Sequence, residues 1–554
     1  MVGIKFPTFA VDFQTTMERA SITRIEKYLW VLAVLMVLPA LLTNLGMMPF
    51  IDDEAIRALV AYEMDLSGNY IVPTLNGETY LNKPPLYNWI LLGFFHLFGR
   101  YDEFVSRFAT VVSSIGFAIT IFLVFRKWLN TRVAILSAFL FLTCGRILLY
   151  DSMLGLIDIT FSWVTFLGIY SVYHFYKKEQ WYALFLVSYL LAAAGFMMKG
   201  LPSVVFQGST LLVFFIWKRD WRRFISLPHV LGGLLFLLLV GGYYYVYSLE
   251  CSVDEALLNL FSESTKRTAT EYGIGRTILH LFTFPFEMLY HFLPWSILAI
   301  IFLSRRTWAR IRQQEFLQFL ILMFLANIIP YWISVEVYPR YILMLVPLFF
   351  GVVASLYQDY NTQEGYLKKT LEVIYFIFLL LLTFSASLPF WYAETPEVSY
   401  LNLKAGFLLG SLLCLIPIYY KFPVTRLTVI VLALLIGRLG FDWFVLPQRL
   451  ENDWGQVCKT STIEAIEIAE IAPIIYENTS FQVTNSFYAT ITAQDFIRRQ
   501  DPPFEVGELI IFDPNIYVDF KYEEICRLYL RFKKREQILG RFLGYNDIRE
   551  NPED

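Results

Sequence analysis

Apolar segments of about 17–22 residues recur along most of the chain, and a helix of that length crosses the roughly 30 Å of hydrocarbon in a membrane. The pattern predicts an all-α polytopic membrane protein with about thirteen transmembrane helices. A shorter apolar run, 85–99, follows two prolines and predicts a helix at the membrane interface. The thirteen expected spans are 28–46, 104–125, 133–150, 154–174, 181–198, 202–217, 226–247, 286–303, 316–334, 341–357, 370–388, 404–420 and 427–446.

Basic residues are concentrated in every second loop between these spans, and the segment before the first span is basic too. By the positive-inside rule, these segments lie in the cytoplasm. We therefore expect residues 1–27 to be cytoplasmic, and the loop 47–103 and the tail 447–554 to lie on the outer side. The basic residues behind this assignment are Arg19, Arg24, Lys27, Arg126, Lys127, Arg132, Lys177, Lys178, Lys218, Arg219, Arg222, Arg223, Arg305, Arg306, Arg310, Arg312, Lys368, Lys369, Lys421 and Arg426.

The tail after residue 446 is less apolar and predicts a small α/β domain on the outer side. Residues 461–477 resemble a helix that begins with a capping box, Ser461 with Glu464. The stretches 480–489 and 507–515 are typical of strands, and 522–542 is typical of a helix with a basic face. Two of the five cysteines, Cys458 and Cys526, share this tail, and a disulfide between them is left open.

Composition supports the membrane assignment and narrows the partners. Hydrophobic residues make up 57% of the chain and charged residues 17%, less than a soluble protein carries. A net charge of −3 gives no sign of a nucleic-acid partner. The cysteines lack metal-ligand spacing, whereas His280 and His291 lie on one face if their segment is helical, so a divalent metal stays possible.

Most of the unusual charged residues fall at the outer ends of spans. Such charges are costly against lipid, so they line a cavity or find a partner. A ring of acids and bases suits an anionic lipid headgroup, because bases bind its phosphate and a shielded carboxylate takes a proton. For the acids at the start of a helix, plain stabilisation of its N-terminus is an equal alternative. The set is Asp53, Glu54, Lys83, Asp151, Asp158, Lys199, Lys266, Arg267, Arg276, Arg340 and Tyr341.

The first outer loop resembles that of the bacterial lipid-A aminoarabinose transferases and, more broadly, the protein O-mannosyltransferase-related GT-C glycosyltransferases. The family pattern appears here as Asp53-Glu54, then GNYIVP, then Leu75-Asn76-Gly77, then Tyr80-Leu81-Asn82-Lys83-Pro84. Weaker matches follow at Arg146 with Asp151, at MKG (198–200), at FLPWS (292–296) and at Pro339-Arg340-Tyr341.

The resemblance implies a multi-pass enzyme of the bacterial inner membrane with its C-terminal domain in the periplasm. It would move a sugar, with inversion, from a polyprenyl-phosphate donor to an acceptor, and the mechanism needs no cofactor. Catalytic roles would fall to Asp53, as general base, and Asp151. The implied donor-phosphate residues are Lys83, Arg267, Tyr341, Tyr80, Arg340 and Arg57, and the other residues expected to line the site are Glu54, Asn82 and Lys199.

The sequence departs from the family pattern at two positions. Ile56 stands where the family has an arginine, with Arg57 next to it, and Asn82 replaces the glutamate of the E-K-P motif. The second change weakens a metal site there and favours a different sugar or acceptor. The acceptor stays open between lipid A, another glycolipid, a polysaccharide and protein, and we expect a monomer. The alternative functions are a flippase for lipid-linked sugars and an inactive envelope scaffold.

Overall fold

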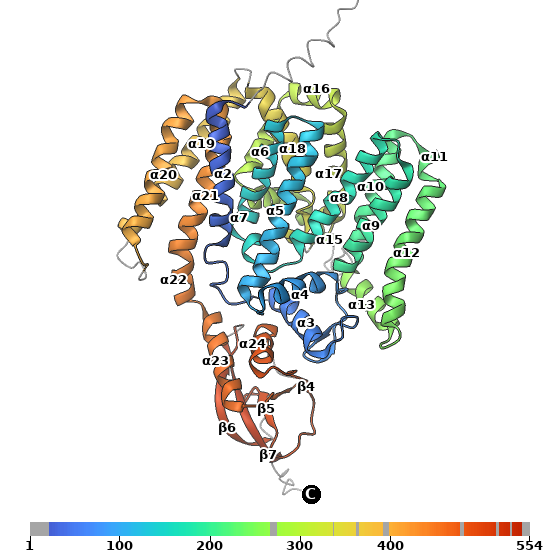
Figure 1. The fold of residues 1–554 in the computed structure, drawn as a ribbon, viewed down its shortest axis with the longest axis vertical. Coiled ribbons are helices and arrows are strands. Elements are labelled where there is room, and N and C mark those ends of the chain that lie inside the picture. The colour runs from blue at the N-terminus through green and yellow to red at the C-terminus, as the bar shows by residue number, and fades with distance from the viewer. Residues whose placement is uncertain are drawn as a thin grey trace, which may run out of the picture.

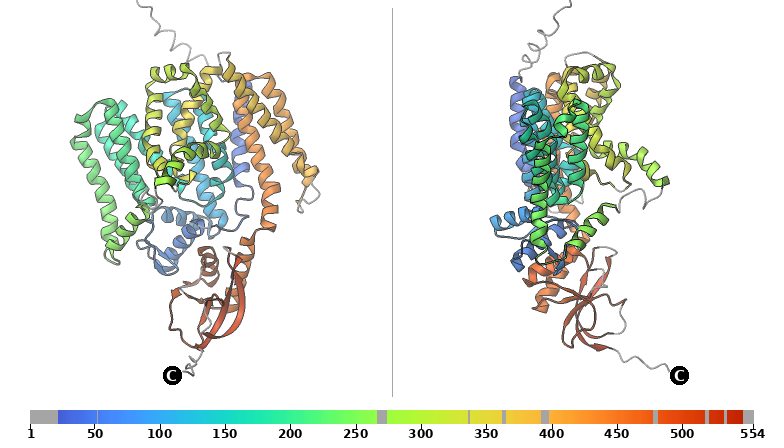
Figure 2. Two further views of the ribbon diagram at one scale, coloured as in Figure 1. Left: turned by 180° about the vertical axis from the view of Figure 1, so that it is seen from behind. Right: turned by 90° about the vertical axis from the view of Figure 1, so that its right-hand side faces the viewer.

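A helical bundle makes up most of the protein, with a small sheet domain at one end (Figure 1). The structure is a computed structural model. It describes residues 22–51, 53–265, 274–335, 337–361, 365–391, 398–476, 481–516, 520–531 and 534–545. The back and side views separate the same two parts, with the C-terminal sheet beyond the end of the bundle (Figure 2).

Eight described helices are long and apolar enough to cross a membrane, or nine if one bent pair counts as a single span. The pair is α6 (Thr131–Thr143) with α7 (Gly145–Leu149), bent by 43° before the short turn η1 (Asp151–Met153). Five of the eight are single helices: α2 (Arg24–Leu42), α5 (Glu103–Trp128), α9 (Trp181–Lys199), α17 (Glu315–Ile333) and α20 (Leu401–Lys421). Two combine a helix with a short neighbour: α11 (Trp221–Phe224) with α12 (Leu227–Tyr247), and α19 (Tyr366–Ser385) with η4 (Leu388–Phe390). The last runs through η5 (Pro423–Thr425), α21 (Arg426–Gly440), η6 (Phe441–Val445) and α22 (Leu446–Glu451).

The other expected spans are shorter, more polar or divided. Three form helices without meeting both criteria: α8 (Asp158–Lys177), α10 (Pro202–Lys218) and α18 (Val346–Asn361). Much of α8 and α18 is buried in the protein, where a helix need not be uniformly apolar. The expected span 286–303 is divided into α15 (Ile274–His291) and η2 (Trp295–Leu303), because Pro294 interrupts the helix. A further short helix, α16 (Arg305–Gln313), precedes α17.

The first outer loop contains α3 (Asp53–Ser67), the two-stranded hairpin β1 (Thr74–Leu75) with β2 (Glu78–Thr79), and α4 (Leu86–Phe98). Asn76 and Gly77 both have positive φ angles, 56° and 77°, as a tight hairpin turn of this type requires. The carboxylate of Glu63 accepts hydrogen bonds from the backbone N–H groups of Asn76 and Gly77, at 2.7 and 3.2 Å. These bonds fix the hairpin against α3.

The C-terminal domain has a five-stranded sheet in the order β4-β3-β5-β7-β6. Strand β3 is parallel to β4 and β5, whereas β7 is antiparallel to β5 and β6. Its elements are α23 (Trp454–Ala469), β3 (Ile474–Tyr476), α24 (Val483–Ala493), β4 (Arg499–Gln500), β5 (Leu509–Phe512), β6 (Phe520–Tyr529) and β7 (Glu536–Tyr545).

Three local expectations for this domain were wrong. Asp453, rather than Ser461, caps α23, which begins earlier than predicted. The stretch 480–489 falls largely in helix α24, whereas 522–542 falls in the hairpin β6–β7. In 522–542 strand pairing overrides local propensity, because β7 pairs along its length with β6 and over residues 538–541 with β5.

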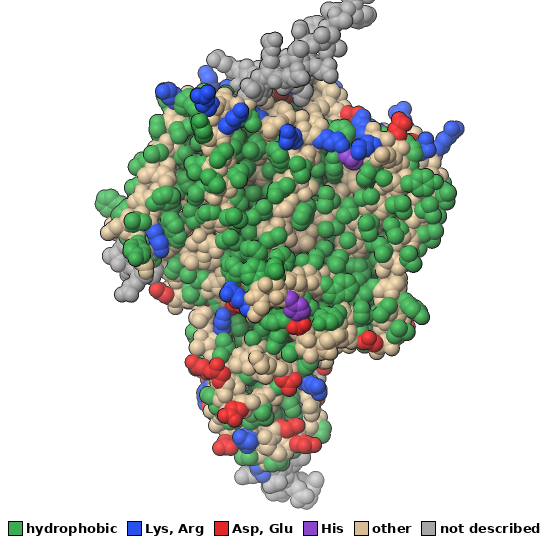
Figure 3. Space-filling model, viewed as in Figure 1, with side chains coloured by type: hydrophobic (Ala, Val, Ile, Leu, Met, Phe, Trp, Pro, Cys, Tyr) green, Lys and Arg blue, Asp and Glu red, His purple; other side chains and the backbone are tan. Residues whose placement is uncertain are grey.

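Lysines and arginines gather at the end of the bundle opposite the C-terminal domain, beyond a band of hydrophobic side chains (Figure 3). The C-terminal domain itself contacts the first outer loop and the start of α5. The hydroxyl of Tyr488 accepts from the backbone N–H of Phe50 at 2.9 Å and donates to Glu103 at 2.7 Å, while Lys459 pairs with Glu103 at 2.6 Å. The domain therefore packs against the segment that leads into Asp53.

Candidate functional site

A cavity of about 660 Å³ lies between the first outer loop and the facing ends of α9, α10 and α17. It brings together eight of the eleven expected catalytic, phosphate-binding and site-lining residues, although they are far apart along the chain. These are Asp53, Arg57, Tyr80, Asn82, Lys83, Lys199, Arg340 and Tyr341. The remaining lining is formed by Ile56, Arg146, Tyr150, Leu201, Pro202, Val205, Phe206, Leu260, Pro330, Tyr331, Ser334 and Tyr338.

Asp53 is the first residue of α3, and a cation from the turn before α18 holds its carboxylate. Arg340, in η3 (Pro339–Ile342), donates from Nη2 to Oδ2 of Asp53 at 2.6 Å. The same guanidinium lies near Asp158, with 3.7 Å between its Nε and Oδ2. Arg340 was expected among the phosphate-binding residues, but in the structure it forms ion pairs with two carboxylates, those of Asp53 and Asp158.

Lys199, at the end of α9, is paired as well. Its Nζ lies 2.5 Å from Oδ1 of Asp158 and 4.3 Å from the centre of the Tyr341 ring. Asp158 is only 4% exposed, so two cations balance its buried charge. Asp158 thus connects the end of α9 with the turn that carries Arg340 and Tyr341.

Two further cations face the cavity without a carboxylate partner among the described residues. Arg57 is buried and donates to the hydroxyl of Tyr80, but its Nε and Nη1 have no hydrogen-bond acceptor in the described part of the chain. The pKa of Lys83 is lowered to about 7, chiefly by burial and next by the charge of Arg57, while Asp53 acts in the opposite direction. This pair forms a site of positive charge that is not neutralised within the protein.

Asp151 is near the cavity but does not line it. Its carboxylate is buried behind Arg146, which pairs with it at 2.9 Å and lies over the Tyr150 ring, 4.0 Å from the ring centre. Five cations therefore line the cavity, whereas three carboxylates contact them, namely Asp53, Asp151 and Asp158. The excess of positive charge suits an anionic ligand.

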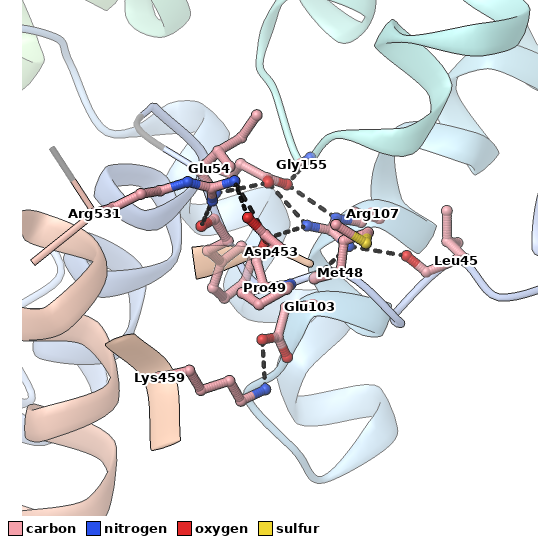
Figure 4. A network of polar contacts seen from close by, with 12 residues as sticks. Leu45, Met48, Pro49, Glu54, Glu103, Arg107, Gly155, Asp453, Lys459 and Arg531 are labelled. Atoms are coloured by element: carbon pink, nitrogen blue, oxygen red, sulfur yellow. Dashed lines mark hydrogen bonds and ion pairs between the residues drawn. The ribbon is translucent and has the colours of Figure 1, made fainter. Parts of the chain in front are cut away.

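Glu54 points away from the cavity. It is 1% exposed and forms a two-pronged ion pair with Arg107 of α5, at 2.9 and 3.1 Å, and it accepts from the backbone N–H of Gly155 at 2.8 Å (Figure 4). Arg107 also donates to backbone carbonyls of the segment before α3, those of Leu45, Met48 and Pro49. Glu54 therefore fixes the start of α3, and with it Asp53, by packing and charge.

Asn82 forms a contact for which no sequence pattern was a signal. Its side-chain oxygen accepts from Nδ2 of Asn259 at 2.7 Å, which connects the first outer loop to α13 (Val253–Thr265). Ser334 and Tyr338 were likewise missed, although they lie in the turn just before Arg340. Two of the expected outer-loop cations, Lys266 and Arg267, lie outside the described residues.

No group of three potential metal ligands occurs among the described residues. His291 lies 3.8 Å from Glu287, and the ring of His280 is buried beside Phe284. All five cysteines are free thiols, so Cys458 and Cys526 are not joined.

Comparison with known proteins gives a family for part of the chain. Residues 82–244 match the family described as dolichyl-phosphate-mannose-protein mannosyltransferase. An uncharacterized protein of Aquifex aeolicus is 24% identical over 372 residues, which are 67% of this chain and 71% of that protein. The undecaprenyl phosphate-alpha-4-amino-4-deoxy-L-arabinose arabinosyl transferase of Shewanella sediminis is 30% identical over 176 residues, so the match spans about a third of each protein (30% and 31%).

The fold extends the likeness over almost the whole chain. ArnT from Cupriavidus metallidurans, solved bound to undecaprenyl phosphate, superimposes with a TM-score of 0.64 at 17% identity, covering 92% of this chain and 97% of ArnT. Its apo state gives a TM-score of 0.60. In its fold, in the family match over residues 82–244 and in the sequence of its first outer loop, this chain is similar to GT-C glycosyltransferases of the aminoarabinose-transferase type.

Proposed function

We propose that the chain is a membrane glycosyltransferase that moves a sugar from a polyprenyl-phosphate donor to an acceptor at the outer face, with inversion. The observation that carries the proposal is one cavity in which a carboxylate, Asp53, faces cations that exceed the nearby carboxylates by two. The fold supports it, because ArnT shares this architecture and was solved with undecaprenyl phosphate. The related arabinosyl transferases act with a sugar on undecaprenyl phosphate.

In this reaction Asp53 takes the proton of the acceptor hydroxyl, and the acceptor oxygen attacks the anomeric carbon. The bond from that carbon to the phosphate oxygen breaks, and the phosphate leaves with the electron pair. A phosphodiester with one negative charge thus becomes a phosphomonoester with a second. The positive charges of Lys83 and Arg57 attract the doubly charged product phosphate more strongly than the singly charged donor, so they stabilise the charge that develops in the transition state. Tyr80 and Tyr341 complete the proposed phosphate site, and Arg267, outside the described residues, stays a predicted phosphate-binding residue.

Asp151 and Lys199 support this site through their partners. Asp151 holds Arg146 at the cavity wall, and Lys199 adds a positive charge beside the Tyr341 ring. Asn82 replaces a glutamate of the family pattern, and its amide pair with Asn259 is neutral. We infer that this part of the cavity contacts a different sugar or acceptor from that of the aminoarabinose transferases, with lipid A, another glycolipid, a polysaccharide and protein as the candidate acceptor classes.

The proposed location is the inner membrane of a bacterium, with the N-terminus in the cytoplasm and the C-terminal domain in the periplasm. The concentration of lysines and arginines at the opposite end of the bundle supports this orientation (Figure 3). The cavity then opens on the periplasmic side, where a lipid-anchored donor in the bilayer and an acceptor from outside can meet.

A flippase for lipid-linked sugars is the second candidate. A polar cavity within a helical bundle would serve either function, but transporters hold their substrate near the midplane between repeats. The charged groups of this cavity lie between the first outer loop and the facing helix ends, on the side where the C-terminal domain packs, and this favours the enzyme. A buried cation such as Arg57, with no carboxylate partner among the described residues, is costly in a scaffold that binds no anion, so the inactive scaffold is disfavoured.

The decisive experiment measures sugar transfer by the purified protein from a panel of radiolabelled polyprenyl-phosphate sugars, for the wild type and Asp53→Asn. We expect transfer from at least one donor, and a fall in kcat of about 10²–10⁴-fold in Asp53→Asn, the usual contribution of a general base. A variant with the wild-type melting temperature and wild-type kcat would remove Asp53 as the base. Donor translocation in liposomes without transfer would favour the flippase.

A further inference from the structure

Arg340 is shared by two carboxylates that come from different helices. It contacts Asp53, at the start of α3, through Nη2 at 2.6 Å, and it lies 3.7 Å from Asp158, at the start of α8, through Nε. Only 16% of its side chain is exposed. Because a guanidinium is a rigid planar fork, its position relative to one carboxylate fixes how it meets the other.

Asp158 is the less accessible of the two acids. Its side chain is 6% exposed, against 37% for Asp53, and it does not line the cavity. Its second oxygen binds Lys199 at 2.5 Å. Asp158 is thus placed to hold two cations from behind, whereas Asp53 is placed to meet a ligand.

We propose that Asp158 is a positioning residue for the transfer reaction: it holds Arg340 and Lys199 in place, and Arg340 in turn orients the Asp53 carboxylate. Oδ2 of Asp53 is fixed by Arg340, while Oδ1 has no hydrogen bond to any described residue and is left for the acceptor hydroxyl. The inference rests on the proposed function, because it assigns Asp53 the role of base.

The charges around Asp53 predict what removal of Asp158 would do. Asp53 shares the cavity with Arg340 of η3, Lys199 of α9, Arg57 of its own helix, Lys83 of the loop after β2 and Arg146 of α7, and the negative charge of Asp158 lies 3.7 Å from Arg340. Without the Asp158 carboxylate, Arg340 would pair with Asp53 alone. Asp53 would become a weaker base, because nearby positive charge favours its ionised form. Anion binding would not weaken, since the cavity would lose one negative charge.

The test compares wild type, Asp158→Asn and Asp158→Glu by kinetics at several pH values. For Asp158→Asn we expect kcat to fall by about tenfold to a hundredfold, as for a slightly misplaced catalytic group. The KM for the donor should stay or decrease, and the acidic limb of the kcat profile should move to lower pH. Asp158→Glu should restore part of kcat. Asp359→Asn is the matched control, since Asp359 also binds an arginine, Arg310 at 2.7 Å, outside the cavity.

Unchanged kcat in Asp158→Asn would overturn the proposal, and so would a lower kcat with the wild-type pH profile, which would indicate a merely structural role. Failure of the proposed function is a separate outcome, in which the wild type transfers sugar from no donor. In that case, the affinity of the purified wild type and Asp158→Asn for undecaprenyl phosphate tests the charge role of Asp158. Equal or tighter binding by Asp158→Asn supports the charge role of Asp158, whereas weaker binding contradicts it.

Discussion

Arg57 and Lys83 are the residues whose state depends most on what occupies the cavity. A buried guanidinium with unused donors is costly, as is a lysine that burial and a neighbouring cation discourage from holding its proton. An anionic phosphate between them would remove both costs. Under the proposed function, this positive charge is in place before the phosphate binds, as in preorganised electrostatic sites.

The lowered pKa of Lys83 predicts that phosphate binding depends on pH. Below about pH 7 Lys83 is protonated and attracts phosphate, and above it the side chain becomes neutral. We expect the Kd for undecaprenyl phosphate to rise as pH increases from 6 to 9. Titration of the phosphate itself acts in the opposite sense, because the phosphate gains charge over the lower part of this range.

Lys83→Arg separates the two effects, since arginine stays charged throughout. The ratio of the wild-type Kd to the Lys83→Arg Kd should increase with pH, which calorimetry or a fluorescent binding assay can measure. A constant ratio across this range would mean that Lys83 does not titrate there or does not contact the phosphate.

At the scale of elements, the hairpin turn of the first outer loop connects α3 with the strand that leads to Tyr80 and Lys83. Gly77 has a φ of +77°, where a side chain is strained, and a Cβ there would lie 3.3 Å from Cγ of Arg498 in the C-terminal domain. The turn is thus hydrogen-bonded to Glu63 within the loop and leaves little room for a side chain beside Arg498.

Gly77→Ala should therefore destabilise the protein by about 1–2 kcal/mol, the usual cost of a left-handed conformation with a side chain. We expect a lower melting temperature and faster proteolysis within the first outer loop. The control is Gly93→Ala in α4, where a Cβ meets nothing within 4 Å and alanine favours the helix. Equal melting temperatures for the two variants would contradict the strain at Gly77.

The sequence predicted elements well where one local property decides them. Spans such as α5 and α12 follow from length and hydropathy alone, and the turn at Asn76-Gly77 follows from its residue types. The helices and strands of the C-terminal tail were harder to predict, because its segments are short and amphipathic. Residues 522–542 have the composition of a helix, but pairing with β5 makes them a hairpin, and nothing within the segment reveals that partner.

For the whole molecule, the orientation in the membrane decides whether the cavity meets the periplasm. The C-terminal domain packs on the loop that leads into Asp53, through Tyr488 and Lys459, so the two must lie on one side of the bilayer. Cysteine labelling of intact cells with a membrane-impermeant maleimide shows on which side of the bilayer the C-terminal domain lies.

We expect Asp501→Cys, exposed in the C-terminal domain, to be labelled in intact cells, and Lys178→Cys, exposed at the opposite end of the bundle, to be labelled only after lysis. A background without the five native cysteines removes their signal. The reverse pattern would place the cavity on the cytoplasmic side and contradict the proposed location.

The sequence by itself determined that the chain is a helical membrane protein and which ends of its helices are basic. It also identified the candidate site residues of the outer face. These properties depend on local hydropathy, on charge and on a forty-residue motif. Only the tertiary structure decided how those residues share their charges. It turned Glu54 towards Arg107, placed Arg340 between Asp53 and Asp158, and left Arg57 and Lys83 without a carboxylate among the described residues. Such pairings depend on distances between helices remote in sequence, and no local pattern encodes them.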